Sequence, residues 1–308
     1  MEVISILNEL GFPLEASWKI GCYAFSPLEA IEKGYYELFA CRFFYPLACQ
    51  NNSEVWICAS KFGAIAVLKE LHLRNIMGCN SYVIYEACGH GHLDVVLWLL
   101  QQGLGKTSSE LFDYTASKGQ LTVLKFLNSL GVCGSVYAMN GACEYGHLDV
   151  VIWLHKNCKE GCTIDAMNWA AENGHLDVVV WLHENRNEGC TECAFDNAAR
   201  NGHLEVVEWL HYYVGIGFTD SMFALVVGNR HLHIVKWLFK HITTRWHSAS
   251  SAIDIAIFNG DTEMVKLLMN HCHRCPSIQA INAAAVMGHV EVVEWLHKTY
   301  GYNCNLKI

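Results

Sequence analysis

Histidine is the residue type in this sequence with the clearest capacity for chemistry, because imidazole binds metals and transfers protons near neutral pH. The 308 residues include 17 histidines. Eleven of them recur at two fixed places in successive similar segments of the chain. Zinc needs its ligands about 2 Å from a single centre, whereas equivalent side chains on neighbouring packed helices lie about 10 Å apart. We therefore expect the histidines to make structural hydrogen bonds at helix turns.

Cysteine offers two further candidates for a metal site, the CxxC pairs Cys190/Cys193 and Cys272/Cys275. The second pair lies in "HCHRC" and has histidines beside it, but no second ligand pair follows at zinc-finger spacing. We expect a polar loop there and predict no metal ligand, although Cys272 and Cys275 leave that question open. The 15 cysteines, in a chain without a recognisable secretion signal, are typical of reduced thiols.

A glycine-rich stretch, "GLGKT" at 103–107, resembles part of a phosphate-binding loop. The full motif has a further glycine at the position of Leu100 and follows a strand. In this chain the stretch follows a predicted helix instead. The metalloprotease motif HExxH and the hydrolase motif GxSxG are absent from the sequence. We therefore predict a protein that is not an enzyme and has no catalytic residues and no cofactor.

The elements that position these residues form a repeat. With the glycine of "GHLDVV" as position zero, nine equivalent positions follow one another, mostly 28 residues apart. They are Gly63, Gly91, Gly119, Gly146, Gly174, Gly202, Arg230, Gly260 and Gly288. A fixed period of this size indicates a solenoid. We predict one solenoid over 1–308, with degenerate repeats or a cap in 1–60, regular repeats in 61–300 and a tail in 301–308.

Each repeat predicts two amphipathic helices. Before the glycine, small or apolar residues occupy positions −8, −7, −4 and −3; after it, apolar residues occupy +4, +5, +7 and +8. A glycine suits the left-handed turn that ends the first helix. Tryptophan recurs at +7, where we expect it in the core. No segment alternates as a strand would, so the predicted fold class is all-α.

The segment "GHLDVVxWL", following a helix of the form A-x-x-x-A-A-x-x-G, resembles the ankyrin repeat over roughly residues 20–304. The usual ankyrin repeat is about 33 residues long. The shortage falls after the second helix, where the family forms a β-hairpin finger, so the resemblance implies reduced or absent fingers. Short repeats of this kind resemble arrays of giant viruses, amoebae and oomycetes. The family resemblance implies a protein-binding scaffold whose first helices line a concave face.

The candidate binding surface is the stripe formed by positions −9, −5 and −2 of the first helix, which are spaced as one helix face. We call it the variable stripe. Over 82–200 it mixes aromatic residues with carboxylates, a composition that favours interface hot spots. Its predicted partner-binding residues are Tyr82, Glu86, Glu110, Tyr114, Tyr137, Asp165, Trp169, Glu172, Asn197 and Arg200. Further along, the same positions form an apolar patch of Leu225, Ile255, Phe258 and Val286.

The composition narrows the class of partner. A net charge of −9 argues against nucleic acid as a partner, and no apolar run is long enough to span a membrane. We expect a protein partner with a basic or amphipathic segment, and a cytoplasmic, intracellular location, which is the host cytoplasm if the source is a virus. Self-association through the C-terminal end and a substrate adaptor for a ubiquitin ligase remain alternatives, although no F-box-like segment is visible.

Overall fold

The computed structural model describes residues 27–34, 52–242 and 246–302. Most of the predicted N-terminal cap in 1–60 and most of the tail in 301–308 lie outside these residues, as does part of the expected break near 241–248. The chain divides into two compact units. Unit 1 comprises residues 1–142 and 147–161, and unit 2 comprises residues 143–146 and 162–308. The two units are described separately below.

Both units consist of paired helices. Unit 1 contains α3 (Pro27–Glu32), α5 (Asn52–Lys61), α6 (Ile65–Leu73), α7 (Ser81–Gly89), α8 (Leu93–Gln101), α9 (Ser109–Ser117), α10 (Leu121–Ser129), most of α11 (Val136–Glu144) and α12 (Leu148–Asn157). Unit 2 contains α13 (Ile164–Glu172), α14 (Leu176–Asn185), α15 (Glu192–Asn201), α16 (Leu204–Trp209), the π-helix η2 (Leu210–Val214), α17 (Asp220–Gly228), α18 (Leu232–His241), α19 (Ala249–Phe258), α20 (Thr262–Cys272), α21 (Ile278–Val286) and α22 (Val290–Tyr300). The described residues contain no strand, which confirms an all-α repeat fold without hairpin fingers.

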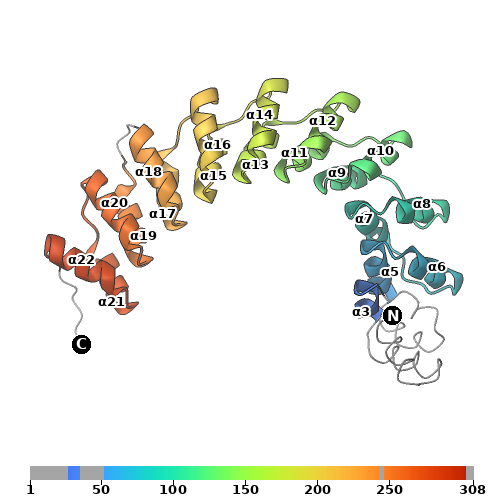
Figure 1. Ribbon diagram of the computed structural model, residues 1–308, viewed down its shortest axis with the longest axis horizontal. Coiled ribbons are helices and arrows are strands. Elements are labelled where there is room, and N and C mark those ends of the chain that lie inside the picture. The colour runs from blue at the N-terminus through green and yellow to red at the C-terminus, as the bar shows by residue number, and fades with distance from the viewer. Residues whose placement is uncertain (1–26, 35–51, 243–245, 303–308) are drawn as a thin grey trace, which may run out of the picture. The chain divides into compact units, whose positions relative to one another are not determined.

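First helices pack on first helices in both units, and second helices pack on second helices in unit 2. In unit 2, α13 contacts α15, α17 contacts α19 and α19 contacts α21, while α18 and α20 form part of a second row (Figure 1). In unit 1, α7 packs between α5 and α9 in the same way. This stacking gives equivalent residues of neighbouring repeats the same surroundings.

The predicted apolar positions of the first helix form the core between the helices. In α13 these positions hold Ala166, Met167, Ala170 and Ala171, all of which are buried. The small side chains allow close approach of neighbouring helices, and α13 and α15 share the most extensive helix contact in unit 2. The prediction of a narrow, small-residue face is therefore confirmed.

The tryptophan prediction was only partly right. Positions +4, +5 and +8 of the second helix are buried, as Val178, Val179 and Leu182 show. Tryptophan at +7 is buried only at Trp237 among the described repeats and is half-buried elsewhere, for example at Trp209. The rings of Trp98, Trp209 and Trp237 pack edge-on against a histidine of the preceding repeat, which is His72, His183 and His211 respectively.

None of the helices in the described parts of the chain combines the length and the apolar character that a membrane span requires.

Candidate protein-binding surface

The variable stripe of unit 1 exposes tyrosines beside carboxylates. Tyr82 begins the stripe on α7 and Tyr137 on α11, and their side chains are 67% and 64% exposed. Glu110 lies in the first turn of α9. Hydrogen bonds from its own backbone amide and from Ser108 lower the pKa of the Glu110 carboxyl, so it carries a full negative charge at neutral pH. Glu86 is half-buried and lies 3.5 Å from Nδ1 of His90.

Tyr114 differs from the other stripe tyrosines because it is already engaged within the protein. Its ring lies 5.4 Å from that of Tyr85, centroid to centroid, and against the backbone of Gly89. The ammonium group of Lys118 lies 5.5 Å above the Tyr114 ring. Burial, and to a lesser extent the charge of Glu86, raises the pKa of Tyr114. The Tyr114 side chain therefore packs inside the repeat stack and is less accessible to a partner than Tyr82 and Tyr137 are.

In unit 2, three of the predicted residues form a network among themselves. The Glu172 carboxylate accepts hydrogen bonds from Nη2 of Arg200 at 2.9 Å and from Nδ2 of Asn197 at 3.0 Å. Asn201 adds a bond to the backbone oxygen of Glu172 at 2.8 Å. These contacts join α13 to α15, so much of the polar capacity of these side chains is used inside the repeat stack. Trp169, which is half-buried, is the aromatic side chain among the predicted partner-binding residues of unit 2.

The apolar patch is exposed in unit 2. Leu225 of α17, Phe258 of α19 and Val286 of α21 are 48%, 47% and 74% exposed. Ile255 is half-buried against the backbone of Gly228, and a Cβ at that glycine would lie 3.5 Å from Ile255 Cγ2. Since α17, α19 and α21 are successive first helices in contact, the patch is a row along one face of the stack.

A histidine at +1 joins its repeat to the preceding one, as His92, His203 and His231 show. Nε2 of His92 donates a hydrogen bond to the carbonyl of Lys61 at 2.9 Å, and a corresponding bond joins His203 to the backbone of Glu172. Burial lowers the pKa of His203, which keeps its ring neutral at pH 7. The expected hydrogen-bonding role is confirmed, with the difference that the partner lies in the neighbouring repeat rather than in the local turn.

The position-zero glycines explain how these rings fit. All nine equivalent positions have a positive φ, including the non-glycine Arg230 at 63°. A Cβ added at Gly174 would lie only 2.6 Å from Nδ1 of His203. The same close approach to the next +1 histidine occurs at Gly63, Gly119, Gly146, Gly202 and Gly260. Glycine therefore suits the left-handed turn, and at those six positions it also leaves the space that the next histidine ring occupies.

A set of polar residues between repeats was missed in the sequence. Asp or Asn at −6 accepts a hydrogen bond from the backbone amide of Ser or Thr at −11 of the next repeat. The N···O distances are 2.8 Å for Ser135 to Asp113, 3.0 Å for Thr191 to Asn168, 2.9 Å for Thr219 to Asp196 and 2.7 Å for Ser277 to Asp254. The recurrence of these residue types at the two positions is the sequence signal that could have predicted the bonds.

The cysteine and histidine residues near Cys272 are engaged separately. The His271 ring stacks on Phe239 with a centroid separation of 4.6 Å, and its Nδ1 hydrogen-bonds the carbonyl of Leu267 at 2.9 Å. Burial raises the pKa of the Cys272 thiol to about 11, whereas metal ligation requires a thiolate. Cys275 hydrogen-bonds Tyr302. Among the residues that the structure describes, no group of three His, Cys, Asp or Glu side chains is placed to hold a metal ion.

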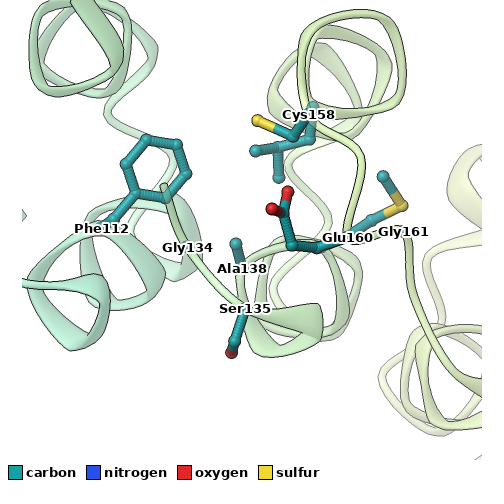
Figure 2. Close-up of a pocket in the computed structure, with 9 residues that line it drawn as sticks. Phe112, Gly134, Ser135, Ala138, Cys158, Glu160 and Gly161 are labelled. Carbon is teal, nitrogen blue, oxygen red and sulfur yellow. The ribbon is translucent and has the colours of Figure 1, made fainter. Parts of the chain in front are cut away.

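A narrow cleft in unit 1 lies between the start of α11 and the loop after α12. Phe112, Ser135, Ala138 and Cys158 contribute to its walls, and the Glu160 carboxylate points into it (Figure 2). The remaining volume is about 10 Å³, which is room for roughly one water molecule. This cleft is too small to bind an organic ligand.

Comparison with protein-family models gives two matches. The model described as ankyrin repeats (many copies) matches residues 141–183 and 167–211. The model described as ankyrin repeats (3 copies) matches residues 221–308. Together they cover just over half of the chain. No curated protein matches the sequence.

Proposed function

Since the chain belongs to the ankyrin-repeat family, a family of protein–protein interaction modules, we propose that it is a non-enzymatic scaffold. Its variable stripe binds a protein partner on the first helices. The exposed tyrosines carry the proposal, because aromatic side chains that are large, rigid and exposed are typical interface anchors. Tyr82 and Tyr137 are the principal anchors in unit 1, and Trp169 contributes in unit 2.

The partner segment is basic or amphipathic. Glu86 and Glu110 lie beside the exposed tyrosines, and the whole chain carries a net charge of −9. Opposite charge across an interface accelerates association and discriminates against wrong partners. Arg200, the one basic residue of the predicted surface, is already paired with Glu172. The stripe thus presents acidic and aromatic groups to the partner.

The test compares partner capture by the wild-type chain and by a Tyr82→Ala/Tyr137→Ala variant. Proteins captured from the source cell by the tagged wild-type chain are quantified by mass spectrometry, and binding is then measured with the purified partner. Loss of two aromatic anchors is expected to weaken binding at least about tenfold. A basic partner segment also predicts that affinity falls as salt is raised.

A matched control is Tyr212→Ala/Tyr213→Ala, which removes two tyrosines from η2 that are 59% and 69% exposed. This variant should bind like the wild type. Circular dichroism checks that both variants fold. Equal binding by the stripe variant, the control and the wild type would disprove the assignment of the stripe.

Self-assembly is a second candidate function, and the apolar patch favours it. Leu225, Phe258 and Val286 form an exposed row on helices that stack on one another, and contiguous exposed apolar surface commonly marks an interaction site. The role of a ubiquitin-ligase adaptor stays a prediction with no specific observation in its favour.

A further inference from the structure

We propose a ligand site in unit 1, separate from the variable stripe, that takes a carboxylate carried on a small apolar body. A cavity of about 250 Å³ lies between the start of α7 and the loop that follows α8. Ser81, Ile84 and Tyr85 line it from α7, and Leu104, Gly105 and Lys106 line it from the loop. Ligand pockets for drug-sized molecules are typically about 300–1,000 Å³, so this cavity fits one side chain or a small organic acid.

The cavity occurs at a repeat junction where position −6 holds neither a carboxylate nor an amide side chain. Position −6 of this repeat holds Tyr85, whereas Asp113, Asn168, Asp196 and Asp254 at the same position bond to the next repeat. The Tyr85 ring instead packs against Tyr114. The Ser108 hydroxyl, at position −11 of the next repeat, accepts a hydrogen bond from the Leu111 amide within α9. Tyr85 offers no carboxylate or amide acceptor for the bond seen at those four junctions, and its aromatic ring forms a wall there instead.

Gly105 keeps the cavity open. A Cβ at this position would lie 2.6 Å from Cδ1 of Ile84, so any side chain would press into the apolar wall. Gly105 and Glu160 both lie 14 residues before position zero of the repeat that follows. In the cleft at α11, Glu160 supplies a carboxylate and leaves about 10 Å³ (Figure 2). The cavity at α7 lacks such a side chain and is about 250 Å³.

The positive charge of the cavity lining favours an anionic ligand. Lys106 is the charged residue of this lining, and no carboxylate lines the cavity. Ion pairs found within the described residues do not involve Lys106. Ile84, Leu104 and the Tyr85 ring provide an apolar surface, while Ser81 adds a hydroxyl. A flat or branched apolar group would pack against these walls while its carboxylate pairs with the Lys106 ammonium group.

The first experiment uses benzoate and its neutral isostere benzamide as probes with the full-length protein. Binding is followed by saturation-transfer-difference NMR as a function of probe concentration. Benzoate should bind saturably, and benzamide at least about tenfold more weakly, because a hydrogen bond to a charged group is worth more than a neutral one. Equal binding of the two probes would overturn the charge assignment, and no binding of benzoate would overturn the site.

Lys106→Met removes the ammonium group while keeping a long side chain. It should weaken benzoate about tenfold and leave benzamide unchanged. Lys125→Met, an exposed lysine of α10 outside the cavity, is the matched control and should bind benzoate like the wild type. Unchanged benzoate binding by Lys106→Met would contradict the proposal.

Gly105→Ala tests the cavity independently of its charge. The added methyl group narrows the space at Ile84, so benzoate and benzamide should both bind more weakly while circular dichroism shows an unchanged fold. Full benzoate binding in this folded variant would place the acid elsewhere.

The carboxylate could belong to a free acid or to the end of a peptide chain, and two further probes distinguish these sources. Acetyl-Gly-Phe is compared with its C-terminal amide. Binding by the acid form, lost in the amide and in Lys106→Met, assigns the cavity to chain ends as well as to free acids. Binding by benzoate alone assigns it to free carboxylic acids. Failure of both benzoate and acetyl-Gly-Phe to bind would overturn the site.

Discussion

At the scale of single residues, two physical reasons favour the recurrent glycine: its positive φ and its close packing against a neighbouring ring. The sequence pattern alone does not separate these two reasons. Gly174 has a φ of 80°, which favours glycine, and the His203 ring of the next repeat occupies the space where a Cβ would lie. Gly189 has a φ of 69°, but no heavy atom lies within 4 Å of the position that a Cβ would take. The comparison of these two glycines separates backbone conformation from packing.

We predict that Gly174→Ala lowers the free energy of unfolding more than Gly189→Ala does. Gly189→Ala should cost about 1–2 kcal/mol for the left-handed conformation. Gly174→Ala should cost about 1–3 kcal/mol more, because its methyl group displaces the His203 ring. Urea denaturation followed by circular dichroism measures both values.

The control is His203→Ala, which removes the ring. In that background Gly174→Ala should cost no more than Gly189→Ala does in the wild type. An undiminished cost would show that His203 is not the reason for the glycine.

At the scale of helices, the bond from −11 to −6 fixes the register between successive first helices. Asp196 of α15 accepts hydrogen bonds from the backbone amide of Thr219 at 2.9 Å and from its hydroxyl at 2.5 Å. Asn168 of α13 holds the same position and accepts a bond from the amide of Thr191 at 3.0 Å. The junction therefore needs a carbonyl-type acceptor, whether charged or neutral.

We predict that Asp196→Asn raises the melting temperature at pH 7. Burial raises the pKa of Asp196 above its usual value, although hydrogen bonds from Thr219 act against this. A raised pKa in the folded state means that the stability contributed by the protonated form is lost as pH rises through that pKa. Asparagine keeps the acceptor and avoids the buried charge.

The advantage of Asp196→Asn should shrink as the pH is lowered through the raised pKa of Asp196, because Asp196 itself then becomes protonated. Melting curves from pH 4 to 7 give the difference at each pH. Asp220→Asn is the comparison variant, because the Asp220 carboxylate also accepts a hydrogen bond from the backbone amide of another repeat, that of Ser248, at 3.0 Å. A lower melting temperature of Asp196→Asn than of the wild type at pH 7 would contradict the predicted sign.

At the scale of the whole molecule, the exposed surfaces divide into an acidic and aromatic part in unit 1 and an apolar row in unit 2. The first supports binding of a basic or amphipathic partner, as proposed above. The second, formed by Leu225, Phe258 and Val286, supports self-association. Solution mass distinguishes the two functions without knowledge of the partner.

The self-assembly candidate predicts that molar mass, measured by size-exclusion chromatography with light scattering, rises with protein concentration. Phe258→Glu should then abolish the rise, because a carboxylate in an apolar interface would lose its hydration. Tyr212→Glu, on a helix outside the apolar row, should leave it unchanged. A constant monomer mass of the wild-type chain would rule out self-assembly and leave the scaffold function.

The sequence by itself determined the all-α repeat, the two helices of each repeat and the core positions other than +7. It could do so because burial on one helix face repeats every 28 residues or so and therefore leaves a periodic pattern. It also placed the histidines in structural roles. These features depend on local helix geometry and on the packing of equivalent helices against one another. Both produce a regular spacing of residue types in the sequence.

Tertiary structure decided which side chains of the stripe remain available. Glu172, Asn197 and Arg200 occupy positions of the variable stripe that hold exposed residues in other repeats. The Glu172 carboxylate of α13 nevertheless accepts hydrogen bonds from Asn197 and Arg200 of α15. Likewise, the cavity at Lys106 exists because Tyr85 and Gly105 meet at one junction between repeats. Such pairings join residues about 20 or more positions apart, and their distances depend on how neighbouring helices pack rather than on the period of either helix.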